Sequence, residues 1–173
     1  LGNLRAFVYT GERLEAWGIG AQGSVQALSA YVEGTYYAKG NKLYVSGRKD
    51  PIFVGPREDA YVLNVVPSPN GDQFAFEVSG GGLYVVSRDG KTVVELGAGH
   101  RPRWSPDGQW LVCFRSTDDG HRYLTSDLYA LRADGQAEVQ LTDTEDVLEM
   151  DPSWSPDGDG IVYYDHRSNR IFL

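Results

Sequence analysis

The sequence predicts an all-β protein, a β-propeller of four-stranded antiparallel blades, and three observations lead to this prediction. The segment RPRWSPDGQWLVCFRS at 101–116 returns as DPSWSPDGDGIVYYD at 151–165, and in weaker form as VVPSPNGDQFAFE at 65–77. Each copy places a Ser-Pro-(Asp/Asn)-Gly turn between two apolar strands, where proline presets φ and glycine closes the hairpin. The 21 glycines fit a chain full of tight turns. Repeats of this length cannot bury their faces alone and are typical of stacked blades.

Taken in order, the repeats divide the single propeller region 1–173 into blades at about 4–28, 29–59, 60–100, 101–150 and 151–173. Strand length, glycine spacing and alternation suit antiparallel hairpins throughout. Only residues 144–150 are expected to form a helical turn, with Asp143 or Thr144 as its N-cap. Four to five blades indicate either part of a six-bladed ring or an early closure, in which residues 4–10 pair beside residues 170–173.

Composition restricts the partners of the chain. A formal net charge of −8 disfavours nucleic acid and anionic membranes, where basic side chains must face phosphate. No run of eighteen apolar residues exists, so no membrane insertion is expected. The single cysteine, Cys113, excludes an intrachain disulfide. Because the first residues include no starting methionine and no leader, we expect a processed or trimmed piece, and the compartment stays open.

Motifs of catalysis are weak or missing. The segment 18–23, GIGAQG, fits the GxGxxG pattern of dinucleotide sites, but the following SVQALSAYVEG lacks a helical stripe, so we interpret it as a turn. There is no G-x-S-x-G, H-x-x-x-H or C-x-x-C spacing. We therefore assign no catalytic residue, and an enzyme is not the favoured class.

The candidate binding surface follows from the meander. Ser-Pro-Asp-Gly turns and the turns at 88–90 and 133–135 share one face, so the longer, charged connections share the other, where function is expected. That face is predicted to carry His100, Arg101, Arg57, Asp118, His121, Arg122, Glu149, Asp151, His166 and Arg167. The three histidines lie in separate loops, which favours solvated side chains over metal ligands. No cofactor is expected, although calcium at the acidic run 143–151 is an alternative.

A second set of residues is predicted to be structural. Trp104 and Trp154 recur at one repeat position, which indicates packing between blades rather than a stacking platform for ligands. Asp107 and Asp157 are expected to accept hydrogen bonds from backbone N–H groups within their turns. The set is Trp104, Pro106, Asp107, Gly108, Trp154, Pro156, Asp157 and Gly158.

The WSPDG turns, with Asp127-Leu128-Tyr129, Asp134-Gly135 and Gln140-Leu141-Thr142, resemble the TolB-type, WD-like β-propeller repeat over residues 101–165. The copy at 65–77 departs from the pattern, since Pro67 stands in the place of tryptophan and Asn70 in that of aspartate. The resemblance implies a periplasmic or extracellular domain of a protein complex, or a domain that gates a hydrolase.

We therefore expect a non-enzymatic scaffold that binds a protein or peptide through its loop face or channel mouth. One alternative is the gating propeller of a prolyl-oligopeptidase-like serine peptidase, whose catalytic domain would lie outside this sequence. A third hypothesis is a metal-assisted propeller enzyme, such as a polysaccharide lyase, with metal at the face of His100, His121 and His166.

Overall fold

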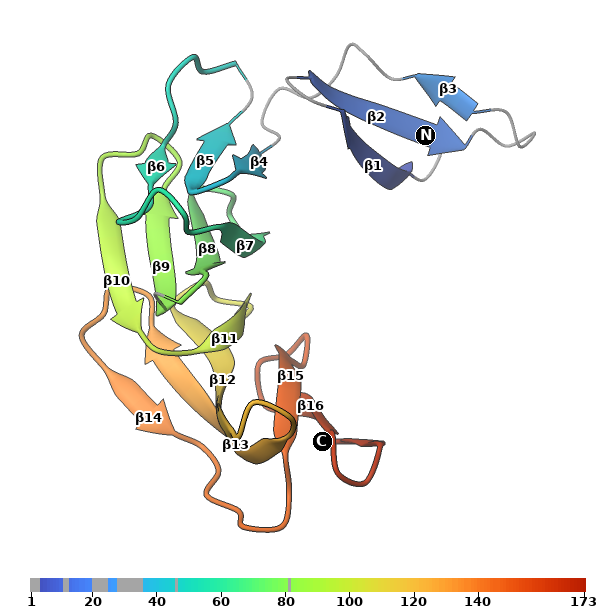
Figure 1. Cartoon of the computed structure of the whole chain (residues 1–173), viewed down its shortest axis with the longest axis vertical. Coiled ribbons are helices and arrows are strands. Elements are labelled where there is room, and N and C mark those ends of the chain that lie inside the picture. Colours follow the sequence, from blue (N-terminus) through green and yellow to red (C-terminus); the bar gives the residue numbers. More distant parts are fainter. Residues whose placement is uncertain (1–3, 11–12, 20–24, 28–35, 46, 81) are drawn as a thin grey trace. The chain divides into compact units, whose positions relative to one another are not determined.

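The computed structural model describes residues 4–10, 13–19, 25–27, 36–45, 47–80 and 82–173, and these form only strands, turns and loops (Figure 1). They build five antiparallel sheets, so the predicted all-β fold class is confirmed. In the described part of the chain, no helix is long and apolar enough to cross a membrane. Contacts divide the chain into two compact units, Leu1–Tyr37 with Val45–Lys49 (unit 1) and Ala38–Tyr44 with Asp50–Leu173 (unit 2).

Unit 1 contains the meander of β1 (Leu4–Thr10), β2 (Arg13–Ile19) and β3 (Val25–Ala27). The glycine-rich segment 18–23 begins inside β2, whereas residues 20–24 lie outside the described residues. The next described element is β3, which pairs antiparallel with β2. A dinucleotide site requires a helix after the glycines, whereas the next described element is a strand; the interpretation of the segment as a turn stays a prediction.

The next sheet joins β4 (Tyr36–Lys39), β5 (Lys42–Val45) and β6 (Phe53–Val54) in that order. Phe53 of β6 packs on the sheet that follows, because its ring centroid lies 4.6 Å from that of Phe76 and 5.3 Å from that of Tyr84. This aromatic contact buries apolar surface that neither sheet could cover alone.

Three further sheets of unit 2 repeat one plan, in which each strand pairs with the next along the chain. The first sheet holds β7 (Val62–Pro67), β8 (Gln73–Val78), β9 (Gly82–Ser87) and β10 (Val93–Gly97). The second holds β11 (His100–Trp104), β12 (Trp110–Asp118), β13 (Tyr123–Arg132) and β14 (Glu138–Gln140). The third holds β15 (Glu149–Trp154), β16 (Ile161–Asp165) and β17 (Arg170–Phe172).

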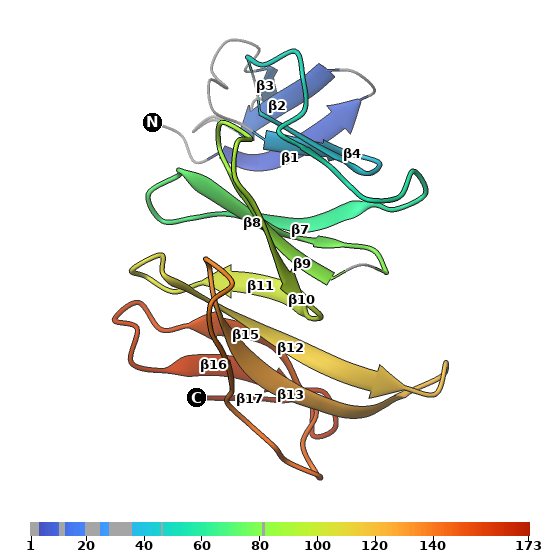
Figure 2. The ribbon, with the colours of Figure 1, turned by 90° about the vertical axis from the view of Figure 1, so that its left-hand side faces the viewer.

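These three sheets stack face to face (Figure 2). Between the first and second sheets, buried side chains form a cluster of Ala75, Leu83, Val85, Leu96, Leu111, Cys113 and Leu131. Between the second and third, Phe114, Leu128 and Met150 are buried, with Ile161, Tyr163 and Tyr164 packed against them. The Trp104 indole N–H donates a hydrogen bond of 3.1 Å to the Val66 carbonyl, which ties β11 to β7. Burial between stacked sheets is therefore the main source of stability of unit 2.

The Ser-Pro-Asp-Gly turns close through side-chain hydrogen bonds. In the turn of 105–108, the Ser105 hydroxyl donates to Asp107 (2.6 Å), and Asp107 also accepts from the backbone N–H of Gln109 (3.0 Å). Asp157 accepts from Ser155 and from the N–H of Asp159 in the same way. The Ser87–Asp89 contact of 2.6 Å repeats this pattern in the turn between β9 and β10. These aspartates hold backbone turns, as the sequence predicted of Asp107 and Asp157.

The first strand of each of the three sheets carries the same irregularity. The pairing of β7, β11 and β15 with the following strand shifts register between residues 63 and 66, 100 and 103, and 150 and 153. Asn64, Arg101 and Asp151 begin these bulges, and all three have a φ of 51°. Each precedes its turn serine by four residues, so the bulge belongs to the repeat. Such bulges redirect side chains out of the regular strand pattern.

The helical turn predicted at residues 144–150 is wrong. This segment is a loop that leads into β15, which begins at Glu149. The Thr144 hydroxyl donates a hydrogen bond to the Glu149 carboxylate (2.9 Å) instead of capping a helix. Pairing with β16 therefore outweighs the local helical preference of the segment.

Candidate functional site

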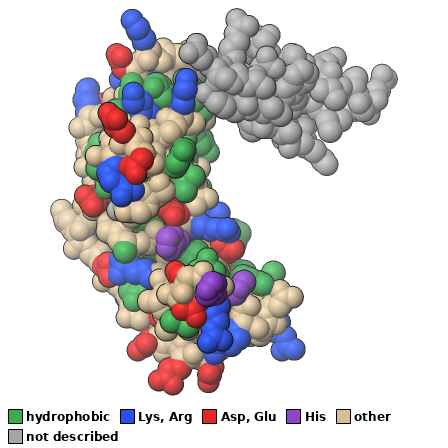
Figure 3. Space-filling model, viewed as in Figure 1, with side chains coloured by type: hydrophobic (Ala, Val, Ile, Leu, Met, Phe, Trp, Pro, Cys, Tyr) green, Lys and Arg blue, Asp and Glu red, His purple; other side chains and the backbone are tan. Residues whose placement is uncertain are grey.

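Two cavities lie at the end of unit 2 that carries the hairpin between β12 and β13. The inner cavity has a volume of about 290 Å³ and is lined by Asn64, Glu77, His100, Arg101, Phe114, Ser116, Asp118, Tyr123, Met150 and Asp151. The hairpin cavity has a volume of about 400 Å³ and is lined by Asp118, Gly120, His121, Arg122, Tyr123 and His166. Because Asp118 and Tyr123 line both, the cavities adjoin. The three histidines gather on this side of unit 2 (Figure 3).

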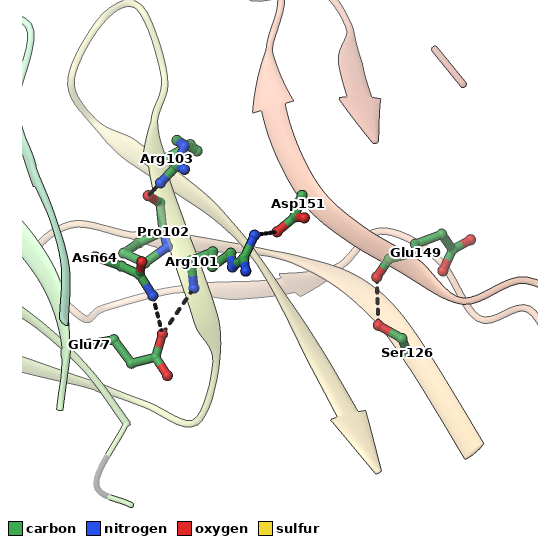
Figure 4. A network of polar contacts seen from close by, with 8 residues as sticks. All are labelled: Asn64, Glu77, Arg101, Pro102, Arg103, Ser126, Glu149 and Asp151. Atoms are coloured by element: carbon green, nitrogen blue, oxygen red, sulfur yellow. Dashed lines mark hydrogen bonds and ion pairs between the residues drawn. The ribbon is translucent and has the colours of Figure 1, made fainter. Parts of the chain in front are cut away.

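The bulged strands supply the inner cavity with its polar lining. Asn64, Arg101 and Asp151, the three residues with a φ of 51°, come from β7, β11 and β15 and all line it (Figure 4). A non-glycine residue adopts positive φ only at a free-energy cost, less for asparagine and aspartate than for arginine. The bulges thus bring equivalent positions of three blades to one site.

Glu77 of β8 is the centre of a hydrogen-bond network in this cavity. Its carboxylate accepts from the Asn64 amide (3.0 Å) and from the Arg101 backbone N–H (3.3 Å), and it lies 2.8 Å from His100 Nδ1. Burial acts to raise the Glu77 pKa, but the hydrogen bonds outweigh burial and lower it below 4.5. The hydrogen bond to Glu77 raises the His100 pKa above 6.5. Both shifts favour the ion pair.

An ion pair connects the second and third sheets across the cavity. Arg101 Nη1 lies 2.5 Å from Asp151 Oδ1, and these side chains are 51% and 42% exposed. Since Arg101 and Asp151 hold equivalent positions in β11 and β15, the pair joins corresponding points of adjacent blades. The remaining guanidinium N–H groups stay open to solvent or to a ligand, because one contact cannot occupy all five donors.

The hairpin cavity is shaped by a turn whose carboxylates bind backbone. Asp118 accepts from the Gly120 N–H (2.8 Å), and Asp119 accepts from the N–H groups of His121 and Arg122 (both 2.9 Å). These backbone hydrogen bonds lower the Asp119 pKa below 3.8. The turn therefore holds His121 and Arg122 at the cavity while its acidic side chains are engaged.

Aromatic rings border the same cavity. The Tyr123 ring meets the His166 imidazole edge-on at 5.7 Å between centroids, and Tyr164 meets that imidazole in a similar way at 6.0 Å. His166 lies in the turn between β16 and β17, so this contact spans two blades. Tyr123 is 41% exposed and lines both cavities.

Seven of the ten predicted binding residues line these cavities: His100, Arg101, Asp118, His121, Arg122, Asp151 and His166. Two others lie outside the cavity linings. Arg57 donates to the Ser79 carbonyl (3.2 Å) and pairs with Asp59 at 3.5 Å, and Arg167 lies 3.4 Å from Asp146. The cavity linings therefore include neither of these two arginines.

The placement of Glu149 on the loop face is wrong, because this residue belongs to β15 and is only 1% exposed. Its carboxylate accepts hydrogen bonds from the hydroxyls of Thr142 (2.8 Å) and Thr144 (2.9 Å). Burial raises its pKa above 4.5, and these two hydrogen bonds only partly oppose the rise. Its backbone carbonyl accepts from Ser126 (Figure 4). Glu149 is thus a structural residue, inaccessible to a ligand.

Sequence reasoning missed Asn64, Glu77, Phe114, Ser116, Tyr123 and Met150 of the cavity lining. Asn64 carried a detectable signal, since it stands four residues before Ser68, as Arg101 does before Ser105. Glu77 and Phe114 carried none, because they are ordinary strand residues that only the stacking of sheets brings to the cavity.

Within the described residues, no group of three or more His, Cys, Asp or Glu side chains is placed to hold a metal ion. His100 lines the inner cavity, whereas His121 and His166 line the hairpin cavity. Cys113 is buried between sheets, and burial raises its pKa to about 12.

The stacked antiparallel meanders define the class of this molecule as a β-propeller, in which the sheets of β7–β10, β11–β14 and β15–β17 repeat one turn and one bulge. Among the described residues, two of the five sheets have the predicted four strands and three have three. No family model and no curated protein matches the sequence. Solved structures do match. The match to the tricorn protease covers 89% of this chain and 17% of the protease chain, with a TM-score of 0.62 and 11% sequence identity.

Two further structures resemble the chain. A prolyl endopeptidase matches 80% of it over 25% of its own chain, with a TM-score of 0.55 and 17% identity. A protein assigned as TolB from Agrobacterium tumefaciens matches 91% over 51% of its own chain, with a TM-score of 0.49 and 19% identity. The chain thus spans about half or less of the length of these proteins. At 11% and 17% identity, the likeness to the tricorn protease and to the prolyl endopeptidase shows the fold alone.

Proposed function

We propose that this chain is a β-propeller scaffold that binds a protein or peptide segment through the inner cavity and the hairpin cavity. The observation that carries the proposal is that the two cavities adjoin at Asp118 and Tyr123, on one end of three stacked sheets. An extended segment could occupy both at once, whereas each cavity alone has the size of a small-molecule site.

The lining supports this choice of ligand. Exposed Tyr123 offers an aromatic surface beside charged and hydroxyl groups, a combination that is typical of the centres of protein interfaces. The carboxylates of Asp118 and Glu77 accept hydrogen bonds from the chain itself, which suits a preorganised recognition surface. Backbone amides of a peptide would find both donors and acceptors here.

A peptide-display experiment tests the proposal. The immobilised chain is panned against random peptides, and the enriched peptides are measured on Tyr123→Ala and on Tyr61→Ala. Tyr61 is a matched control, since it is 60% exposed and lines neither cavity. We expect Tyr123→Ala to weaken binding by roughly tenfold or more, as for an aromatic residue at an interface centre, and Tyr61→Ala to leave it unchanged.

Two results would contradict the scaffold. Panning that enriches no peptide over a blank surface would remove peptide binding. Hydrolysis of p-nitrophenyl acetate that disappears in His100→Asn would instead indicate a catalytic site built on the Glu77–His100 contact.

The gating domain of a serine peptidase and the metal-assisted enzyme stay predictions. The likeness to a prolyl endopeptidase, at 17% identity, shows the fold alone. An open reading frame that continues into a G-x-S-x-G domain would support the first alternative, and bound divalent metal at the histidine face would support the second. A periplasmic or extracellular compartment likewise stays an expectation from the resemblance.

A further inference from the structure

All three histidines of the chain line the two cavities, although they come from β11, from the hairpin after β12 and from the turn after β16. Arg101 and Arg122 join them there. The chain as a whole carries a formal charge of −8, whereas at the two cavities two arginines and three histidines stand beside the three carboxylates of Glu77, Asp118 and Asp151. Figure 3 shows both basic and acidic side chains beside the histidines.

The acidic side chains at these cavities already have partners. Glu77 accepts from Asn64 and from the Arg101 backbone and contacts His100, and Asp151 pairs with Arg101. Asp118 and Asp119 accept from backbone N–H groups of their own turn. Each of these carboxylates therefore already has at least one partner within the chain.

The donor-bearing side chains of the hairpin cavity have fewer partners within the chain. The imidazoles of His121 and His166 form no hydrogen bond or ion pair with any residue that the structure describes, and the His166 imidazole makes ring contacts with Tyr123 and Tyr164. Arg122 Nε lies 3.5 Å from Asp119 Oδ2, which is longer than a typical N–H···O hydrogen bond. The hairpin cavity thus presents three donor-bearing side chains, those of His121, Arg122 and His166, beside one carboxylate, that of Asp118.

We propose that the two cavities recognise carboxylates, and that the ligand is an acidic peptide segment. The inference rests on the proposed function and specifies its ligand. A carboxylate in the hairpin cavity would accept from Arg122, His121 and His166, and a second one in the inner cavity would accept from the open N–H groups of Arg101.

Singly charged carboxylates fit this site better than phosphate. Glu77, Asp118 and Asp151 stand at the same cavities, and their repulsion of a ligand rises with the ligand's charge. Phosphate recognition in proteins generally uses clustered arginines, whereas the donors here are mixed imidazole and guanidinium groups spread over two adjoining cavities.

The test uses the peptides enriched by panning, in four forms: unchanged, with Asp and Glu replaced by Asn and Gln, with an amidated C-terminus, and with both changes. Calorimetry at low salt compares them. If side-chain carboxylates are the recognised groups, the Asn/Gln form loses about tenfold in affinity. If the terminal carboxylate is recognised, the amidated form shows that loss instead. Amide forms that bind as tightly as the parent would overturn carboxylate recognition while the proposed function stands.

Variants of the protein complete the test. Arg122→Gln is compared with Arg132→Gln, which makes the same charge change at the opposite end of the sheet, where Arg132 pairs with Asp134 at 3.1 Å. We expect Arg122→Gln, and separately His121→Asn with His166→Asn, to weaken the acidic peptide about threefold to fivefold, as for exposed ion pairs, and to leave the amide form unchanged. Equal weakening by Arg132→Gln, or equal weakening of both peptide forms, would contradict the inference. If panning yields no peptide, the proposed function and this inference fail together.

Discussion

At Glu77, burial and hydrogen bonding act on one carboxyl group in opposite directions. Burial raises its pKa, and the hydrogen bonds from His100, Asn64 and the Arg101 backbone outweigh this effect. The folded state therefore binds a proton at Glu77 less readily than the unfolded state, so its stabilising contribution is present above pH 4.5 and is lost as the pH falls through the lowered pKa. His100 behaves oppositely: its contribution is present below pH 6.5 and is lost as the pH rises through the raised pKa.

We therefore expect Glu77→Gln to reduce the free energy of unfolding most between pH 4.5 and 6.5, where both members of the pair are charged in the folded and partly in the unfolded state. The loss should be about 1 kcal/mol, because the His100 side chain is 48% exposed and solvent screens the pair. Urea titrations from pH 3.5 to 8.5 measure it. Glu58→Gln, at an exposed position, serves as control. A loss that does not vary with pH would contradict this account.

For single residues, the sequence indicated which polar side chains reach the site better than it indicated their burial and their hydrogen-bond partners. His100, Arg101 and Asp151 were expected at the binding face because charged residues there follow or precede turns. Glu149 was wrongly predicted to lie on the loop face. Hydrogen bonds from two threonines allow its carboxylate to be buried, and no spacing in the sequence reveals these partners. Glu77 was missed because its role depends on a histidine 23 residues away.

Among the elements, the blade repeat offers a natural comparison between two tryptophans. Trp104 donates its indole N–H to the Val66 carbonyl of the preceding sheet, whereas the indole N–H of Trp154 is buried and has no hydrogen-bond partner among the described residues. A buried donor without a partner reduces stability, and a paired one contributes about 1 kcal/mol. The two repeat positions are thus equivalent in sequence but different in energy.

We expect Trp104→Phe to lower the free energy of unfolding by about 1 kcal/mol more than Trp154→Phe, because only the first substitution removes a hydrogen bond. Both substitutions change volume by the same amount, so the difference reports on the indole N–H. Urea denaturation followed by far-UV circular dichroism gives both values. Equal losses would show that packing alone decides the contribution of these residues.

At the start of β9, the backbone of Gly82 lies close to that of Gly97. A Cβ at Gly82 would lie 2.5 Å from the Gly97 carbonyl oxygen, and the φ of Gly82 is +103°. Gly97 also has a positive φ, +83°, but a Cβ there would meet nothing within 4 Å. We expect Gly82→Ala to lower the free energy of unfolding by about 1–3 kcal/mol more than Gly97→Ala does, because the backbone that a Cβ would meet cannot move aside as a side chain can. Thermal denaturation of both variants measures the difference, and similar melting temperatures would contradict the clash.

Elements were the level at which the sequence was most informative. The Ser-Pro-Asp-Gly turns and the apolar strands around them appear as predicted, because proline, glycine and aspartate specify those turns locally. The segment 144–150 was predicted wrongly, because its fate depends on the pairing of β15 with β16. The bulges at Asn64, Arg101 and Asp151 were not predicted, although the fixed spacing to the turn serine was visible.

In the whole molecule, the candidate site lies within unit 2, one of the two compact units of the chain. Both cavities and both buried clusters between sheets are formed by residues 50–173 of unit 2. The stability of stacked repeats is approximately the sum of their own stabilities and of contacts between neighbours. Unit 2 therefore has the contacts that an independently folding piece requires.

We expect the fragment 38–173, which contains unit 2, to unfold in a cooperative urea transition and to bind the peptides selected on the full chain within about threefold. Circular dichroism and calorimetry measure the two properties. A gradual, non-cooperative transition would show that unit 1 is needed for folding. A cooperative transition with lost binding would show that the site extends beyond unit 2.

The bulge that recurs at Asn64, Arg101 and Asp151 has a consequence for how such a protein can change. The backbone adopts a φ of 51° at each position while the side chain is an amide, a guanidinium or a carboxylate. The backbone conformation of the bulge is thus the same whichever functional group the side chain carries. Substitutions at these three positions would therefore change part of the polar lining of the inner cavity, and offer a short mutational route to new ligands on an unchanged framework.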